Sequence, residues 1–273
     1  MAHESQVRYS AMVDAKLRET LVKKDGVIFN NRYEGNPKAG SVKIPVRDTE
    51  VDVDDYSKTD GATATHGSTA YVTCLIDKDK AVNEIIDGFD ADSVPDNLVA
   101  DRLDSAGYSM GLQVENDATV VLEAAATALS STTALTKTTV YEAIVDVRTA
   151  MTKAKVPNDN KRFMLVSPDT YALILKSPEF VKASALGDAV VQTGAQGRIA
   201  GFNIFEDNTL SATTEFIAGH PNWCTRVKEW SVPVHLQDLA ASGKFIGASA
   251  VQGRSVYAHK VTKPTTLFIK KNA

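Results

Sequence analysis

Residues 48–70 separate two β-rich runs of the sequence and carry few side chains that form a core. The first half of this segment is acidic, with Glu50, Asp52, Asp54 and Asp55, and the second half is rich in glycine, threonine and serine. Such a connection is too long for an ordinary hairpin turn. We therefore expect an extended loop that is either disordered or stabilised by something outside its own subunit.

The runs on either side of this loop have the character of β-strands. In residues 42–46 apolar and polar side chains alternate around Pro45, which predicts an edge strand because proline cannot donate to a ladder. Residues 71–76 form a second run with high β-propensity. The loop therefore connects two predicted strands.

Two segments have helical periodicity. Apolar residues repeat every three, four or seven positions after Asp96, the predicted N-cap, so we expect a helix from about Asn97 to about Leu129. It would be roughly 50 Å long at 1.5 Å per residue. Residues 9–24 predict a shorter amphipathic helix before it.

From residue 131 onward the pattern alternates between helices and strands. Ser167, Pro168 and Asp169 predict the capped start of a helix. The predicted elements are a helix over 139–155, a strand over 162–166, the helix that follows, a glycine-rich segment over 187–201, and strands over 202–205, 214–218, 251–258 and 266–269.

Composition and spacing exclude several classes of site. The chain has 273 residues and a formal net charge of −4, so any basic surface must be local. Cys74 and Cys224 lie far apart and predict buried, reduced thiols. The five histidines form no metal-binding motif, and we expect no metal and no cofactor. No stretch reaches the ~18 apolar residues of a membrane span, and no signal sequence is evident, so we expect a cytoplasmic protein without a membrane partner.

The glycine-rich segment also lacks the spacing of a nucleotide site. No lysine follows its glycines as a phosphate loop requires, and the dinucleotide fingerprint is absent. No strained nucleophile turn occurs elsewhere. We therefore expect no catalytic residues and no enzyme activity, and interpret the segment as a flexible turn.

Residues 162–210 resemble a stretch found in major capsid proteins of tailed bacteriophages. A hydrophobic strand, a Pro-containing turn, a helix with Tyr171 and Ile174, spaced glycines ending at Gly201-Phe202, and a further strand occur in the order typical of that family. The resemblance implies an α+β fold of the Hong Kong type. Its parts are an N-terminal arm over 1–35, an extended β-hairpin loop over 36–80, a peripheral domain with a long spine helix over 81–130 and 251–273, and an α/β axial domain over 131–250.

The same resemblance implies a function in assembly. The expected product is an icosahedral head, built from pentamers and hexamers around double-stranded DNA in the host cytoplasm, with DNA bound non-specifically. The expected inter-subunit contacts are Lys43, Asp54, Asp55, Tyr56 and Lys58 in the loop, and the expected axial-domain turn contains Gly194, Gly197 and Gly201. The chain leaves no room before Met1 for a fused scaffolding segment, so a separate scaffolding protein and a portal are expected partners.

Two alternatives remain at this point. An encapsulin-like compartment has the same fold and loads a protein cargo in place of DNA. A soluble α/β enzyme would use the 187–201 segment, and substitution of Gly194 or Gly197 would then abolish ligand binding. Fold alone does not separate the first alternative from a phage capsid.

Overall fold

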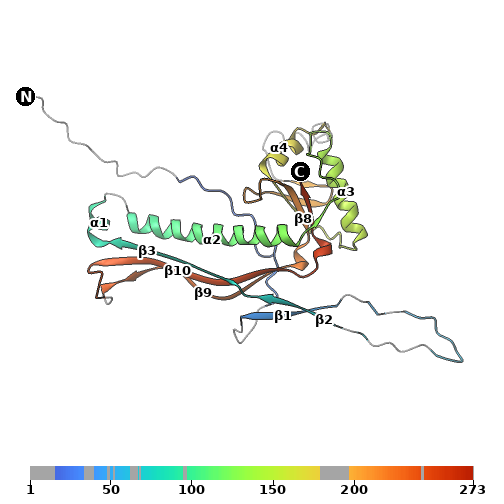
Figure 1. Ribbon diagram of the computed structural model, residues 1–273, viewed down its shortest axis with the longest axis horizontal. Helices are drawn as coiled ribbons and strands as arrows, with labels where there is room; N and C mark the ends of the chain where they lie inside the picture. The colour runs from blue at the N-terminus through green and yellow to red at the C-terminus, as the bar shows by residue number, and fades with distance from the viewer. Residues whose placement is uncertain are drawn as a thin grey trace, which may run out of the picture.

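The computed structural model describes residues 16–33, 40–47, 50–51, 53–61, 67, 69–94, 97–178, 197–240 and 243–272. In Figure 1 these residues form an elongated region, a compact region at one end of it, and a hairpin that protrudes from the body. Helices and strands are both well represented, as an α+β chain requires.

The elongated region is a three-stranded antiparallel sheet with a long helix along one face (Figure 1). It consists of β3 (Lys78–Asp87), α1 (Gly88–Ser93), α2 (Leu98–Ala125), β9 (Cys224–Asp238) and β10 (Ala248–Val261), with the strands in the order β3-β10-β9. Ala106 of α2 packs against Ile86 and Val251 of the sheet. The helix thus stiffens a narrow sheet that could not bury its apolar face alone.

The long helix predicted from the sequence is confirmed as α2. Its N-cap is Asn97, whose side chain accepts a hydrogen bond from the backbone N–H of Ala100. Asp96, the predicted N-cap, lies outside the described residues. The helix ends at Ala125, earlier than predicted, because Thr127 and Ala128 leave it to join a sheet.

The compact region is built on a six-stranded mixed sheet. Its strands are β4 (Thr127–Ala128), β5 (Phe163–Val166), β6 (Arg198–Ile199), β7 (Phe202–Glu206), β8 (Thr214–Gly219) and β11 (Phe268–Lys271), in the order β4-β11-β8-β5-β7-β6. Helices α3 (Val140–Lys153) and α4 (Pro168–Leu175) complete it, and Ser167 caps α4 as predicted. Short 3-10 turns at Pro221–Trp223 and Pro264–Thr266 link the compact region to β9 and β10.

Strand β5 explains how the compact sheet is covered on both faces. All four of its side chains are fully buried. Met164 and Val166 pack in the core under α3 and α4. Phe163 and Leu165 point to the other face, where they pack with Leu122 of α2. A continuous apolar strand is the pattern expected for a strand buried on both sides.

The predicted hairpin is confirmed as the antiparallel pair of β1 (Ser41–Val46) and β2 (Ala70–Leu75). Val46 and Ala70 are the last paired residues before the loop. Ile44 and Cys74 are buried against Val227 of β9 and Ala258 of β10, so the base of the hairpin is fixed to the elongated region.

Two parts of the fold differ from the sequence predictions. Residues 16–24 are not helical, and residues 9–15 of the predicted helix lie outside the described residues. Strands β3 and β9 were not predicted. In β3 charged and polar residues interrupt the apolar ones, and the strand gains most of its stability from pairing with β10, more than 160 residues later in the chain.

Glycine substitutions in α2 give a first test of the packing. The Gly107→Ala change is expected to raise the free energy of unfolding by about 0.5–1 kcal/mol, since alanine is the better helix former and a Cβ at this position meets no atom within 4 Å. A Cβ at Gly111 would lie 2.7 Å from Cδ1 of Leu21 in the N-terminal segment. Gly111→Ala should therefore raise the free energy of unfolding by less than Gly107→Ala does, or lower it. Equal increases for the two variants in urea denaturation would contradict the Leu21 contact.

Candidate functional site

The described part of the chain between β1 and β2 extends away from the body of the molecule (Figure 1). The contact residues predicted from the sequence, Lys43, Asp54, Asp55, Tyr56 and Lys58, are all exposed. Lys43 lies on β1, and the other four lie in the described part of the loop. The structure therefore places them on one protruding element, and none of them belongs to a hydrophobic core cluster.

Large apolar side chains in this loop are left in water. Val51 is 87%, Val53 is 96% and Tyr56 is 75% exposed. A turn closes the end of this stretch, where Ser57 and Gly61 pair through two backbone hydrogen bonds of 3.2 and 2.9 Å. Several large apolar side chains exposed within one short segment favour an interaction surface. The loop thus has the chemistry of a contact element.

The predicted axial turn lies in another part of the molecule. Gly194 is outside the described residues, and Gly197 is exposed. Gly201 has φ +88° and follows Ala200 at φ 48°, so this pair makes the tight connection from β6 to β7. The left-handed conformation favours glycine at position 201. The structure does not bring these glycines together with the loop residues.

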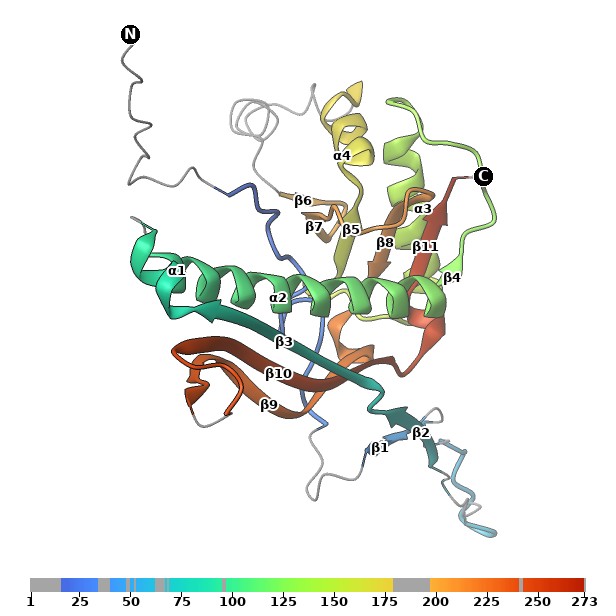
Figure 2. The same ribbon diagram turned by 60° about the vertical axis from the view of Figure 1, so that its left-hand side comes forward.

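The N-terminal segment 16–33, termed the arm below, runs across the molecule between α2 and the compact region (Figure 2). Its first part is held to α2 by polar contacts. Lys16 forms an ion pair of 2.7 Å with Asp101, and Tyr108 accepts a 2.9 Å hydrogen bond from the backbone N–H of Glu19. The arm therefore lies along the helix in an extended conformation.

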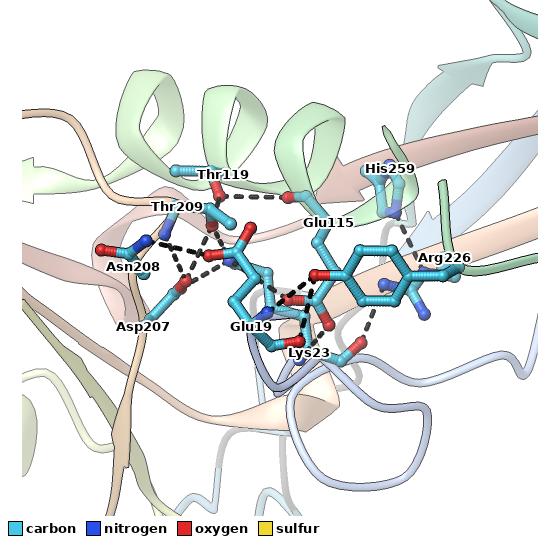
Figure 3. Close-up of polar contacts among 10 residues, drawn as sticks. Glu19, Lys23, Glu115, Thr119, Asp207, Asn208, Thr209, Arg226 and His259 are labelled. Carbon is cyan, nitrogen blue, oxygen red and sulfur yellow. Dashed lines mark hydrogen bonds and ion pairs between the residues drawn. The ribbon is translucent and has the colours of Figure 1, made fainter. Parts of the chain in front are cut away.

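Lys23 is the centre of a buried polar cluster (Figure 3). Its Nζ lies 2.5 Å from Oδ2 of Asp207 and 2.5 Å from Oγ1 of Thr209, both of which follow β7. Its backbone N–H donates to Oε1 of Glu115 on α2 at 2.7 Å. The side chains of Lys23 and Asp207 are 0% and 1% exposed. This lysine thus joins the arm, the helix and the compact region.

Arg226 of β9 continues the cluster on the far side of the arm (Figure 3). It donates to the carbonyl oxygen of Lys23 at 2.9 Å, to Oδ1 of Asp25 at 2.8 Å and to Nε2 of His259 at 3.0 Å. Burial, opposed by the charge of Asp25, lowers the pKa of Arg226. Burial and the neighbouring charge of Arg226 lower the pKa of His259 to about 3. His259 is therefore a neutral acceptor at neutral pH.

Asn30 fixes the end of the arm. Its side-chain amide donates to the carbonyl oxygens of Pro221, Asn222 and Cys224 at 2.7, 3.0 and 3.0 Å. Its backbone N–H donates to the carbonyl oxygen of Cys224 at 2.8 Å. Its carbonyl oxygen accepts a hydrogen bond from the backbone N–H of Arg226, also at 2.8 Å. The sequence did not predict this anchor or Lys23, since no local motif marks residues whose partners lie so far along the chain.

Other candidate groups are taken up by the fold. Cys74 and Cys224 are buried free thiols, as predicted, and burial raises the pKa of Cys224 to about 12. Lys270 is buried and donates to the carbonyl oxygens of Ser131 and Thr133. The described residues contain no cluster of metal-ligating side chains. No helix in the described ranges has the length and apolar character needed to cross a bilayer.

Comparisons with known proteins agree with this arrangement. A family model described as phage capsid protein matches residues 84–233. A solved structure from Mycobacterium phage Che8 superposes with a TM-score of 0.81 at 23% identity, over 97% of this chain and 96% of that one. The capsid of cyanophage P-SCSP1u gives 0.78 at 12% identity, over 98% and 93%. The capsid of an empty GTA particle gives 0.69 at 13% identity, over 98% and 95%. A sequence comparison with curated proteins finds no match.

Proposed function

The chain belongs to the phage capsid protein family, and on this premise we propose that it assembles as pentamers and hexamers into an icosahedral head. It is a structural major capsid protein, and its place is the virion capsid. The family match is to a phage capsid protein, so the encapsulin-like alternative is not favoured.

The observation that best supports assembly is the protruding hairpin. Its loop exposes Val51, Val53 and Tyr56, and the hydrophobic core clusters of the subunit include none of them. A neighbouring subunit would remove this apolar surface from water, at about 25 cal/mol per Å² buried. A loop of one subunit that lies on the body of the next makes a heterologous contact, which closes into a ring when the rotation between successive copies is a whole fraction of a turn. Lys43, Asp54, Asp55 and Lys58 would flank that contact.

We propose the domain division implied by the resemblance with two strands reassigned. The N-terminal arm keeps residues 1–35 and the extended loop keeps 36–80, whereas the peripheral domain (81–130 and 251–273) and the axial domain (131–250) exchange two strands. Strand β9, within 131–250, pairs with β10 and is grouped with the peripheral domain. Strand β11, within 251–273, pairs with β8 and is grouped with the axial domain, together with the turn that contains Gly197 and Gly201.

The proposed partners are a separate scaffolding protein, a portal and packaged double-stranded DNA, with assembly in the host cytoplasm. The net charge of −4 supports DNA contacts that are weak and independent of sequence, because strong binding requires many phosphate-neutralising cations.

Removal of the loop tests the proposed function. Val46 and Ala70 are directly paired, so residues 47–69 can be replaced by Asn-Gly, the preferred two-residue hairpin turn. The shortened subunit is expected to fold and to form no closed shells in electron microscopy, whereas the full chain forms them under the same conditions. An unchanged unfolding midpoint is the control for folding. Regular shells of the shortened subunit would show that assembly does not need the loop.

A further inference from the structure

A cavity of about 240 Å³ lies at the base of the hairpin and has a basic lining. Its charged side chains are Arg32 from the arm, Arg47 at the end of β1, and Lys263 after β10. Among the described residues, no aspartate or glutamate lines it. The remaining lining residues are Tyr33, Ile44, Pro45, Val46, Asn222, Trp223 and Thr262. The cavity thus combines three cations with aromatic and aliphatic walls.

The two arginines keep their charges available to a ligand. Arg32 donates to Oδ1 of Asn222 at 2.6 Å, a neutral partner that orients the guanidinium without neutralising it. Neither Arg32 nor Arg47 forms an ion pair with a carboxylate among the described residues. Guanidinium groups bind carboxylates and phosphates through paired hydrogen bonds. The ligand that fits is therefore anionic.

The loop of the same chain offers matching chemistry. Asp54 and Asp55 are exposed and directly precede Tyr56, which is 75% exposed. The two carboxylates are complementary in charge to Arg32 and Arg47. The tyrosine ring is complementary to the apolar walls that Pro45 and Trp223 give the cavity. A tyrosine in a pocket with charged neighbours is typical of residues that dominate binding energy at interfaces.

The loop cannot readily fill the cavity of its own subunit. Arg47 begins the loop, and the described residues 53–61 lie at its far end, beyond β1 and β2 (Figure 1). We propose that Asp54, Asp55 and Tyr56 of one copy dock into the cavity lined by Arg32, Arg47 and Lys263 of a second copy. This contact rests on the proposed assembly function and names its receptor surface, and because donor and receptor differ, it repeats head to tail.

Charge reversal tests the pairing. Asp54→Lys with Asp55→Lys, and separately Arg32→Glu with Arg47→Glu, are each expected to lower the yield of assembled particles about tenfold or more, because like charges then meet in the contact. A chain with all four substitutions is expected to recover assembly. All four positions are exposed, so the unfolding midpoint of each variant should stay near that of the wild type.

A disulfide test reports the contact directly. The two native thiols are buried, so added cysteines can be followed alone. A chain with Arg47→Cys and Asp55→Cys is expected to give a ladder of covalent multimers on oxidation, since each copy has one donor and one receptor position. Asp55→Cys paired with Lys137→Cys, at an exposed site of the compact region, is the matched control and should give no ladder.

The outcomes separate this inference from the function on which it rests. If the wild type and both reversed variants assemble equally, the contact is wrong and the assembly function stands. If the Arg32→Glu, Arg47→Glu variant assembles normally and loses DNA, the cavity binds a polyanion and the contact is again wrong. If the wild type forms no regular particles, the proposed function fails, and this inference fails with it.

Discussion

Replacement of Lys23 by alanine is expected to lower the free energy of unfolding by about 3–5 kcal/mol, because it leaves a buried charge without its partner. Asp207, 1% exposed, would keep only the hydrogen bonds that its Oδ1 accepts from Thr209. Glu115 would keep the bond from the backbone N–H of residue 23. Urea denaturation of the unassembled subunit measures the loss.

Lys16→Ala is the matched control for this prediction. Lys16 in the arm also forms an ion pair with α2, at 2.7 Å from Asp101. The side chains of Lys16 and Asp101 are each one-third exposed, however. An exposed pair contributes about 0–1 kcal/mol, so the loss should be small. Lys23→Ala combined with Asp207→Ala should cost less than the sum of the two single changes. Equal losses for Lys16→Ala and Lys23→Ala would contradict the buried cluster.

The second large effect is a dependence of stability on pH through His259. Its pKa is about 3 in the folded subunit, and its ordinary value in an unfolded chain is about 6.5. Between these values the unfolded state binds more protons, so stability is complete above pH 6.5 and falls as the pH drops toward 3. The limiting slope is about 1.4 kcal/mol per pH unit, which gives a loss of about 2 kcal/mol between pH 7 and pH 5.

His259→Gln isolates this contribution. The amide oxygen of glutamine can accept the hydrogen bond from Nε of Arg226 but does not titrate in this range. The variant is expected to have a flatter pH profile between pH 7 and pH 5, above the range in which most carboxylates titrate. His235→Gln, at an exposed position on β9, should keep the profile of the wild type. A His259→Gln profile as steep as the wild type would show that other groups cause the acid sensitivity.

Local sequence patterns predicted those elements that are fixed by neighbouring residues, such as a helix cap, and those whose side chains are all buried. The apolar run of β5, the edge proline of β1 and the Ser167 cap of α4 all appear where the sequence indicated them. The helix expected before Lys24 was wrong over its described part. Leu21 meets Gly111 of α2, and Leu17 is fully exposed, so tertiary contacts with α2 replaced helical packing of these leucines.

One part of the candidate site was indicated by local sequence, and two parts depend on contacts between distant residues. Composition indicated the extended loop, since an acidic segment with few core-forming residues is either disordered or stabilised by something outside its own subunit. The Lys23 cluster could not be predicted, because Glu115 and Thr209 lie 92 and 186 residues from it along the chain. In the sequence a buried lysine cannot be distinguished from a surface lysine, because only the fold brings its carboxylate partners close. The basic cavity was missed for the same reason, as its three cations come from distant segments.

The arm also has a consequence for the order in which the subunit completes itself on the ribosome. Arg226 follows Lys23 by 203 residues, and Asn30 precedes its carbonyl partners by 191 to 194. At about 5–20 residues per second, residues 23–30 emerge about 10–40 s before these partners. Residues 23–30 therefore lack their partners at 221–226 during this interval, and a molecule that binds these residues then would compete with the subunit's own completion.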